Sequence, residues 1–489
     1  MARRRILRRR ANYVARRVLY FQGRLSRKNV LAKGRKRLRP SYFNEIYDDA
    51  GTLRGQYEVL RGVYRRLGDE ELANRILRAR ERLGELGATF PVDDGAGDLE
   101  RLLPVDWVPR IIVAGEWRTV SEGLLQRGKA LNAWLRGVYG GGQDLVPEEI
   151  VRGSVFYRPH DLPGSSPPIH IYGPDVVHLA TGEYVVLEDN VRVPSGVAYS
   201  EAIRRAGLET MPEIYEAYRA LEIYSYYDRL GETLEFAAPE GVEDPNVVVI
   251  TRGGSDPAFF EHHRIAQACG IALMTLADCA VSEGFLHARE SGRKIDVVYR
   301  RFDEDYVDTD LPELERVYLE GNVALVNAPG VGVADDKAVF PYVPAMIEHY
   351  LGEVPILRNA PTYALTEEET RAEVIERLPE MVVKPREGYG AQGILVGPEA
   401  LPDDIDAARR NINRDPTQFV AQETLDFSTH MLRGDGEASA EVFVDLRAFV
   451  LPAIDYIMPG GLTRVAQPGT RVVNSTAGGS SKDTLVLED

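Results

Sequence analysis

Residues 209–300 alternate helical stretches with short apolar runs, and this alternation constrains the fold more strongly than any other feature of the chain. A long helix is predicted first, followed in order by a buried strand at 247–251, a helix at 257–269, and strands at 272–276 and 294–300. A helix between two strands returns the chain to the same end of the sheet, so the strands lie parallel. The sequence therefore predicts a parallel α/β layer.

The flanking segments show other patterns. Apolar residues near helical spacing predict two helices within 41–90, and an amphipathic helix at 119–139 ends at a triple glycine. From 169 the pattern changes to strands, with a hairpin whose turn is Thr-Gly, and 380–489 is again rich in strands. Three aromatic side chains are expected to pack in a core: Trp107, Trp117 and Trp134. The fold class is α/β (α+β).

The charge is distributed unevenly. Residues 1–40 carry sixteen Arg and Lys and no acidic residue, whereas the remaining chain has a net charge of −32. A body this acidic repels nucleic acid and anionic membranes, so only the tail is a candidate for binding either. We interpret the tail as a disordered extension or the product of a wrongly chosen start codon. A basic arm for nucleic acid and the remnant of a tag site at 19–23 are the alternatives.

No apolar stretch approaches the ~18–20 residues that span a bilayer, and residues 1–30 lack the apolar core of a secretory signal. We therefore expect a cytoplasmic protein without a membrane partner. The length of 489 residues allows about two to four domains.

Segment 381–396 reads as a short apolar strand, a glycine-rich loop and a second strand. It contains one lysine, one acidic residue and three glycines: Lys384, Glu387, Gly388, Gly390 and Gly393. Glycine lets backbone N–H groups approach phosphate oxygens, and a lysine ammonium neutralises phosphate charge. The spacing is neither that of a Walker A loop nor that of a Rossmann turn. The segment is typical of a polyphosphate site, and an ordinary glycine-rich hairpin is the alternative.

Three polar residues follow a predicted strand at Glu188, Asp189 and Asn190. In an extended chain Glu188 and Asn190 project from the same face, so that their oxygens converge as Mg²⁺ ligands while Asp189 points away. A polar turn after a strand is the alternative. Arg192 and Ser195 follow in a turn that can present donors to an anionic ligand.

Further polar segments are less specific. Asp335 or Asp336 is expected to cap a helix that contains Lys337, whose ammonium either reaches a phosphate or is simply solvated. The strand-to-loop crossing near residues 420–425 is of the kind whose backbone contacts an adenine edge. Two later strands each expose an arginine, Arg447 and Arg464, for which structural ion pairing is the alternative to ligand binding.

Taken together, these segments resemble the circularly permuted ATP-grasp proteins (type 2), which are similar to glutathione synthetase and glutathionylspermidine synthetase. The resemblance covers about residues 41–489 in one order, through the following segments: PVDWVPRIIVAGEW, GLLQRGKALNAWL, VVLEDNVRVPSGVAY, FFEHHRIAQACG, IDVVYRRFDEDYVD, GNVALVNAPGVGVADDKAVFPYVPAMIEHYLGE, VVKPREGYGAQG, AQETL, VDLRAFV, GGLTRVA and VVNSTAGGSSKDTLVL. It implies a permuted ATP-grasp fold in which the Glu-x-Asn motif precedes the lysine loop.

The resemblance also implies ATP and Mg²⁺ as cofactors and a role for each matched residue. The residues implied to bind ATP are Lys337, Lys384, Gly388, Gly390, Gly393, Gln422, Glu423 and Thr424. Those implied to hold Mg²⁺ are Glu188, Asn190 and Glu387. Those expected at the acceptor carboxylate are Arg110, Arg192, Ser195 and Arg301. The resemblance further implies that Arg464 faces the transferring phosphoryl group, and it is assigned as catalytic with Lys384 and Arg301. The second cation of that strand in glutathione synthetases is replaced by Ala466, so Lys482 is assigned to the phosphates.

On this basis we expect an ATP-grasp fold with an inserted parallel α/β domain and an N-terminal helical segment. The predicted divisions are 1–40 (tail), 41–145 (helical segment), 146–208 (strands with Glu-x-Asn), 209–320 (α/β domain) and 321–489 (ATP-grasp subdomains). The predicted activity is an ATP-dependent ligase that joins a small-molecule or peptide carboxylate to an amine through an acyl phosphate. A non-catalytic nucleotide-binding scaffold and a phosphotransferase are the alternatives.

Overall fold

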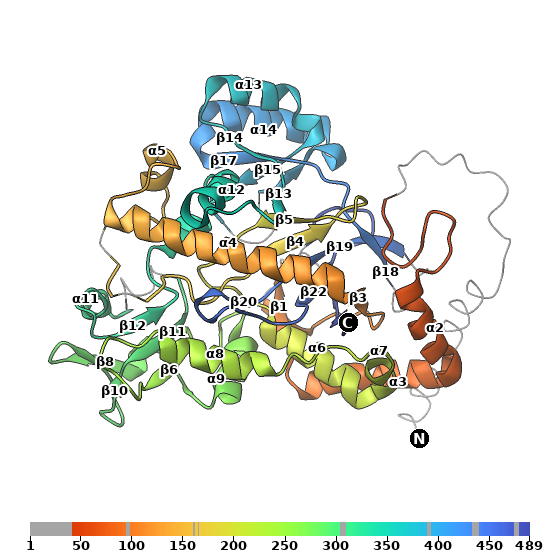
Figure 1. Ribbon diagram of the computed structural model, residues 1–489, viewed down its shortest axis with the longest axis horizontal. Helices are drawn as coiled ribbons and strands as arrows, with labels where there is room; N and C mark the ends of the chain where they lie inside the picture. The colour runs from red at the N-terminus through yellow and green to blue at the C-terminus, as the bar shows by residue number, and fades with distance from the viewer. Residues whose placement is uncertain are drawn as a thin grey trace.

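The computed structural model describes residues 42–93, 98–159, 162–164, 166–303, 310–388, 393–432, 440–473 and 479–489 (Figure 1). The basic tail at 1–40, Gly390 and the small-residue loop at 474–478 lie outside the described residues. Helices and several sheets are combined in one mixed architecture, which confirms the predicted α/β class.

A four-stranded parallel sheet confirms the predicted α/β layer. Its strands lie in the order β12-β11-β6-β7, and α9 (Phe259–Cys269) connects β6 to β7. The strand bounds are Val247–Thr251 for β6, Ala272–Met274 for β7, Val297–Arg301 for β11 and Ala324–Val326 for β12. Every residue of β6 and β11 is buried, as expected of parallel strands that are covered on both faces.

The single long helix predicted beside this layer is divided. The structure has α7 (Pro212–Tyr218) and α8 (Ser225–Phe236) in its place, because Arg219 adopts a left-handed conformation at the end of α7, and α6 (Val197–Thr210) precedes them. Met211 leaves the helical conformation and Pro212 begins a new helix, because proline fits the first turn of a helix but not its interior.

The strand predicted at 294–300 is also divided. Asp296 separates β10 (Lys294–Ile295) from β11, and its carboxylate accepts the backbone N–H of Asn246 at 2.9 Å. β10 instead joins β8 (Cys279–Ser282) and β9 (Phe285–Ala288) in a small antiparallel sheet.

A mixed seven-stranded sheet combines strands from distant parts of the chain. Its order is β13-β5-β4-β19-β22-β23, and β18 also pairs with β19. The bounds are β4 (Asp175–His178), β5 (Tyr184–Glu188), β13 (Arg358–Asn359), β18 (Thr429–Leu432), β19 (Ala440–Arg447), β22 (Leu462–Val465) and β23 (Ser480–Lys482). β4 and β5 form the hairpin that the Thr-Gly turn predicts.

A smaller antiparallel sheet has its own helices and core. Its order is β14-β17-β15-β16, with bounds Thr362–Ala364, Phe419–Glu423, Met381–Pro385 and Leu395–Val396. α13 (Glu368–Glu376) and α14 (Pro402–Arg414) lie with it at the top of the molecule (Figure 1). Met381, Val383 and Ala421 pack with Val374 and Ile412 in this core.

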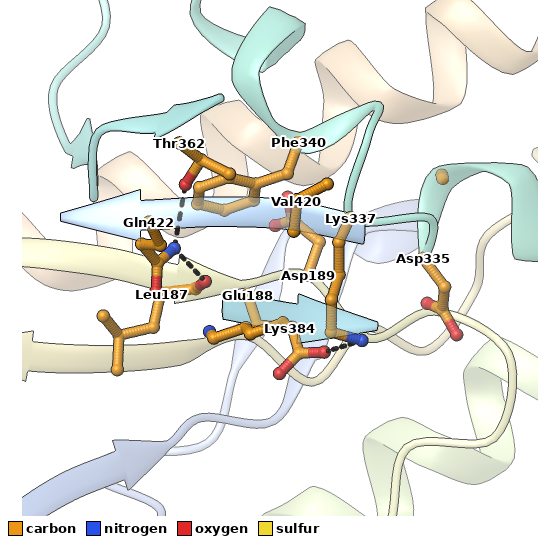
Figure 2. A pocket seen from close by; sticks show the side chains of 11 residues that line it. Leu187, Glu188, Asp189, Asp335, Lys337, Phe340, Thr362, Lys384, Val420 and Gln422 are labelled. Atoms are coloured by element: carbon orange, nitrogen blue, oxygen red, sulfur yellow. Dashed lines mark hydrogen bonds and ion pairs between the residues drawn. The ribbon is translucent and has the colours of Figure 1, made fainter. Parts of the chain in front are cut away.

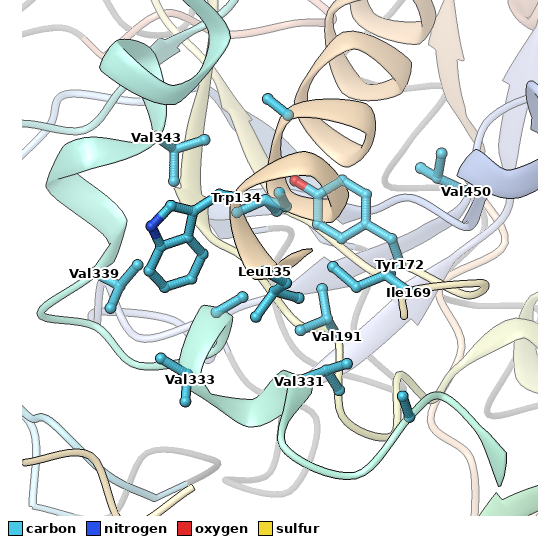
Figure 3. Packing of buried hydrophobic residues seen from close by; sticks show 14 of the residues in the cluster. Trp134, Leu135, Ile169, Tyr172, Val191, Val331, Val333, Val339, Val343 and Val450 are labelled. Atoms are coloured by element: carbon cyan, nitrogen blue, oxygen red, sulfur yellow. The ribbon is translucent and has the colours of Figure 1, made fainter. Parts of the chain in front are cut away.

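The longest helix, α4 (Ala114–Gly140), begins before the predicted position and ends where Gly141 adopts a left-handed conformation, as the triple glycine predicts. Trp134 and Leu135 from this helix pack against valines of the segment 331–343 (Figure 3). The three tryptophans are buried, which confirms their predicted place in a core.

The remaining elements complete the body. The two helices predicted within 41–90 are α2 (Gly55–Leu67) and α3 (Asp69–Glu85). The others are β1 (Thr89–Asp93), β2 (Asp98–Leu102), β3 (Arg110–Ile112), α5 (Glu148–Arg152), α11 (Glu313–Leu319), α12 (Val343–Met346), β20 (Val450–Leu451), β21 (Tyr456–Ile457) and β24 (Thr484–Val486). Among the described helices, none combines the length and the apolar character that a membrane crossing requires.

Candidate functional site

A small pocket lies where the antiparallel sheet meets the end of β5 (Figure 2). Its walls come from the β5 end, the segment 334–340, and strands β14, β15 and β17, and they comprise Leu187, Glu188, Asp189, Ala334, Asp335, Lys337, Phe340, Thr362, Lys384, Val420 and Gln422. Three residues that the sequence assigned to phosphate or metal, Glu188, Lys337 and Lys384, therefore lie together. They come from three distant segments of the chain.

The charges of these three residues are only partly compensated. Lys337 Nζ lies 2.8 Å from Glu188 Oε1 and donates to the Gly388 carbonyl at 3.3 Å. Lys384 Nζ has no hydrogen bond or ion pair with any described residue. Burial lowers the pKa of Lys384, and the charge of Lys337 adds to this effect. Burial also opposes the ionisation of Glu188, but the two lysines outweigh it and lower its pKa. Glu188, Lys337 and Lys384 together thus carry one excess positive charge, which an anion can neutralise.

The other end of the pocket is largely apolar, with Phe340, Val420 and Leu187 around Gln422. Gln422 Nε2 donates to the Leu187 carbonyl at 3.2 Å and to Thr362 Oγ1 at 2.9 Å (Figure 2). This arrangement suits a flat, partly polar ring. This apolar end of the pocket lies beside Lys384 because the strand of Gln422, β17, pairs with the strand of Lys384, β15. In that pairing Gln422 stands opposite Val382.

Glu423 and Thr424, which the sequence grouped with Gln422, do not line the pocket. Strand alternation turns Glu423 to the opposite side, where it pairs with Arg377 at 2.8 Å. Thr424 Oγ1 donates to the Glu380 carbonyl at 2.6 Å. Only Gln422 of the three is a pocket residue.

Asp189 lines the pocket and Asn190 does not, which differs from the expected alternation. The reason is that β5 ends at Glu188, so that Asn190 lies beyond the regular strand. Asn190 nevertheless directly follows the pocket residue Asp189, and its buried Nδ2 has no partner among the described residues.

Asp175 is a residue that the sequence analysis missed. It is the cross-strand partner of Glu188 in the β4–β5 hairpin, so two carboxylates meet at the edge of the pocket. Arg447 at 2.5 Å and Arg464 at 2.9 Å outweigh burial and lower the pKa of Asp175 to about 2. The hairpin pattern could have predicted the position of Asp175, because a Thr-Gly turn places the first residue of one strand opposite the last residue of the next.

Arg464 lies in an ion-pair cluster next to the pocket and not in its wall. Its guanidinium contacts Asp445 at 2.5 Å and Asp175 at 2.9 Å, and Arg447 also pairs with Asp175. The ion pairing that was the alternative to ligand binding for Arg447 and Arg464 is therefore present. Arg464 is also near enough to Lys384 to lower its pKa.

The helix predicted around Lys337 is absent, and Lys337 lies in a turn between short 3₁₀ segments. Tertiary partners hold the two acidic residues that were expected to cap it. Asp335 accepts from the Val191 N–H and from Arg192 Nε at 2.8 Å, and Asp336 pairs with Arg386 at 2.7 Å. Burial raises the pKa of Asp335 despite its arginine partner. The Asp336–Arg386 pair ties the segment of Lys337 to the strand of Lys384.

Arg192 is partly buried and is already engaged. It contacts Asp335 and also Asp303 at 3.2 Å, and its guanidinium lies 4.1 Å from the centre of the Phe156 ring. It supports the pocket through Asp335 and does not line it.

Arg301 and Ser195 lie together as expected, but their polar groups bind protein partners. Arg301 Nη2 donates to Ser195 Oγ at 2.6 Å and to Glu261 Oε1 at 2.8 Å. Glu261 Oε2 in turn accepts the N–H groups of Gly196 and Ala198 at the start of α6. Arg301 is 2% exposed, so the structure gives this cluster a role in holding the helix end.

Two cations that the family resemblance assigns to ligands are enclosed away from the pocket. Arg110 is 0% exposed and binds the Glu45 carboxylate at 2.6 and 2.8 Å. Lys482 is also 0% exposed, and its Nζ donates to Asp106 Oδ2 at 2.6 Å and to two carbonyls. Both cations are thus paired with a carboxylate and have no exposed surface, although Arg110 Nη1 has no partner among the described residues.

The glycine loop is described in part. Gly388 and Gly393 have φ of 107° and 73°, values that favour glycine and confirm their turn-forming role. Gly390 lies between them outside the described residues. Glu387 is half-buried and does not line the pocket.

The residues at the β5 end fit a magnesium ion that also binds phosphate. Mg²⁺ commonly takes one or two carboxylates from the protein and its remaining oxygens from water and substrate phosphates. Glu188 is a carboxylate of this kind and Asn190 carries an amide oxygen, whereas the neighbouring Asp175 is paired with Arg447 and Arg464. No group of three His, Cys, Asp or Glu suited to a metal is found in the described ranges.

Comparison with known proteins places this site in a family. The sequence profile described as "Circularly permuted ATP-grasp type 2" matches residues 109–466. The chain belongs to this family. The match includes both Glu188 and Lys384, so the permuted ATP-grasp order explains why the two sides of the pocket are far apart in the sequence.

Relatives of this ATP-grasp protein include chains of similar length. An uncharacterized protein of Synechocystis sp. (sll0335) is 40% identical over 472 residues, which cover 92% of this chain and 97% of that protein. A Frankia alni protein with the provisional name glutamate–cysteine ligase 2-3 is 36% identical over 92% of this chain, but the chain spans only 54% of its length. The apo structure of a glutathione synthetase-like effector (GSS30) from Globodera pallida has a TM-score of 0.55 at 12% identity, covering 85% of this chain and 97% of that one. This last likeness concerns the fold alone.

Proposed function

We propose that the pocket binds ATP with Mg²⁺ and that the protein is an ATP-dependent carboxylate–amine ligase. The observation that carries this proposal is the convergence of Glu188, Lys337 and Lys384 in one pocket, where the two lysines share one carboxylate. Membership of the ATP-grasp family supports it.

In this proposal the pocket residues have distinct roles. Lys384 binds a phosphate oxygen, and Lys337 exchanges Glu188 for a second one. The freed Glu188, with the amide oxygen of Asn190, would hold Mg²⁺, which would supply neutralisation of the phosphate charge. Phe340 and Gln422 contact the base. The glycine loop that begins at Gly388 covers the phosphates.

The proposed reaction needs no protein nucleophile. A carboxylate oxygen of one substrate attacks the γ-phosphorus, the bond to the bridging oxygen breaks, and ADP leaves with that electron pair. An amine nitrogen then attacks the carbonyl carbon of the acyl phosphate, phosphate leaves, and the nitrogen loses a proton to give the amide. Positioning and charge neutralisation account for most of the catalysis in phosphoryl transfer, which fits a site of lysines and carboxylates.

A second candidate, nucleotide binding without ligation, is favoured by a specific observation. Arg110 and Arg301, the cations expected at an acceptor carboxylate, hold Glu45 and Glu261. The ligase name of the Frankia relative does not decide the matter, because the match spans only 54% of that protein.

The deciding experiment is an assay of ADP formation with Mg²⁺ and a panel of carboxylate–amine pairs. We expect turnover that requires both substrates and is lost in Lys384→Met and Glu188→Gln. Lys129→Met is the matched control, because Lys129 forms an exposed surface ion pair with Asp455.

The outcomes separate the candidates. ADP formation that is unaffected by both pocket substitutions contradicts the ligase. Nucleotide binding without turnover across the panel supports the non-catalytic alternative, and a phosphorylated product that forms without any amine supports a phosphotransferase.

A further inference from the structure

Directly behind the pocket, three buried side chains form a closed polar group, here called the Arg127 triad: Arg127, Asp189 and Tyr172. Arg127 Nε and Nη2 each donate to one Asp189 oxygen at 2.7 Å, and the Tyr172 hydroxyl donates to Asp189 Oδ1 at 2.5 Å. Arg127 and Asp189 are each 1% exposed. Arg127 Nη1 also donates to Asn359 Oδ1 at 2.6 Å, so the guanidinium bridges two segments.

Stability alone does not account for this triad. Desolvation offsets most of the attraction in a buried ion pair, and apolar residues of similar volume commonly stabilise a fold as well or better. The position of the triad is more informative. Asp189 stands between Glu188 and Asn190, and the Arg127 guanidinium lies 5.0 Å from the ring centre of Phe340, a pocket residue.

The residues around Asp189 need an external support. β5 ends at Glu188, so regular strand pairing no longer fixes residues 189 and 190. One backbone hydrogen bond remains there, from the Gly173 N–H to the Asn190 carbonyl at 2.8 Å. Arg127 extends from the long helix α4 and donates two hydrogen bonds to the Asp189 carboxylate. These bonds restrain both the position and the rotation of that carboxylate.

We infer that Arg127 is a positioning residue that, by fixing Asp189, sets the direction in which Glu188 and Asn190 present their oxygens to Mg²⁺. This inference rests on the proposed function. Residues that orient metal ligands commonly change metal affinity by about 10- to 100-fold when they are replaced. Lysine cannot substitute for Arg127, because a single ammonium cannot match two carboxylate oxygens and Asn359 in one plane.

The chain contains a matched triad that serves as a control. Arg204 Nε donates to the two Asp483 oxygens at 3.0 and 2.8 Å, and the Tyr215 hydroxyl donates to Asp483 Oδ2 at 2.9 Å. The Arg204 and Asp483 side chains are 4% and 6% exposed, and none of the three residues lines the pocket. The chemistry and burial are therefore alike, and the location differs.

The test compares Arg127→Lys with Arg204→Lys. ATP binding is measured by calorimetry while MgCl₂ is varied, and thermal unfolding is recorded for each variant. We expect the Mg²⁺ concentration for half-maximal enhancement of ATP binding to rise about tenfold or more in Arg127→Lys. In Arg204→Lys it should stay within about twofold of the wild type, because that triad is remote from the metal ligands.

A second pair of variants covers the case in which a lysine variant does not fold. Tyr172→Phe and Tyr215→Phe each remove one hydroxyl with little change in volume. Loss of one hydrogen bond to Asp189 should raise the required Mg²⁺ concentration by about two- to tenfold in Tyr172→Phe alone.

Each outcome bears on a separate claim. Suppose that the wild type binds ATP and that substitutions in the two triads change the required Mg²⁺ concentration equally. The positioning inference is then wrong and the proposed function stands. If the wild type does not bind ATP at any Mg²⁺ concentration, the proposed function is wrong and the inference goes with it.

Discussion

Two regions of the molecule contain cations that the family resemblance assigns to ligands, and they differ in how completely those cations are paired. In the pocket, Lys384 has no partner among the described residues, and Lys337 shares the single carboxylate of Glu188. Away from the pocket, Arg110 and Lys482 are fully enclosed with Glu45 and Asp106. A cation can bind an external anion only where the protein leaves its charge uncompensated. The comparison therefore separates binding residues from structural ones within one set of motifs.

The largest effect that this comparison predicts is on stability. Replacement of Arg110 by methionine leaves the buried Glu45 carboxylate without its arginine, with only Ser428 and His178 beside it, which should cost about 3–5 kcal/mol in the free energy of unfolding. ATP affinity measured on the folded fraction should stay unchanged. The control is Arg118→Met, since the Arg118–Asp489 pair is exposed and should contribute less than about 1 kcal/mol. A variant of Arg110 that folds normally but loses ATP binding would contradict the assignment of Arg110 as a structural cation.

The reverse behaviour is expected at Lys384. Lys384→Met should weaken ATP binding by about 10- to 100-fold, the range for loss of a hydrogen bond to a charged group. The free energy of unfolding should not fall, because the substitution removes a partly buried ammonium that has no partner among the described residues. Calorimetric titration and denaturant unfolding measure the two quantities. Loss of stability with unchanged ATP affinity would place Lys384 with the structural cations.

The enclosed region should also show a pH dependence. Burial opposes ionisation of Glu45, but Arg110 outweighs it and holds the pKa of Glu45 far below its value of 4.5 in an unfolded chain. The folded state therefore binds fewer protons, and the stability from this pair is present above about pH 4.5 and is lost as the pH falls below it. The free energy of unfolding should fall by up to about 1.4 kcal/mol per pH unit from this group. Glu45→Gln should remove that slope, and an unchanged acid limb in the variant would contradict the assignment.

The smallest expected effect concerns Glu423. Its carboxylate pairs with the partly exposed Arg377 and faces away from the pocket. Glu423→Gln should lower the free energy of unfolding by about 0.2–1 kcal/mol and leave ATP affinity unchanged. Gln422→Ala is the informative neighbour, because Gln422 lines the pocket and its loss should weaken binding of the base. Equal effects at the two positions would mean that strand alternation does not decide which side chain meets the ligand.

Local patterns predicted much of the fold. The parallel layer, the helix α4, the β4–β5 hairpin and the buried tryptophans all follow from apolar periodicity and turn residues. The helix around Lys337 was predicted wrongly for a physical reason. Asp335 and Asp336 have good capping side chains, but Arg192 and Arg386 bind them more strongly than a helix end does.

By itself, the sequence determined the residue types of the site and the order of its segments. A strand that ends in Glu-x-Asn, a lysine before a glycine turn and a lysine after two aspartates are each legible in the chain, because they depend on neighbours a few residues away. Only the tertiary structure decided which charges remain uncompensated. Glu45 binds Arg110, Asp106 binds Lys482 and Asp189 binds Arg127 across long sequence separations, whereas Lys384 is left without such a partner. Electrostatic pairing depends on distance in space, and the folded sheets bring these groups together.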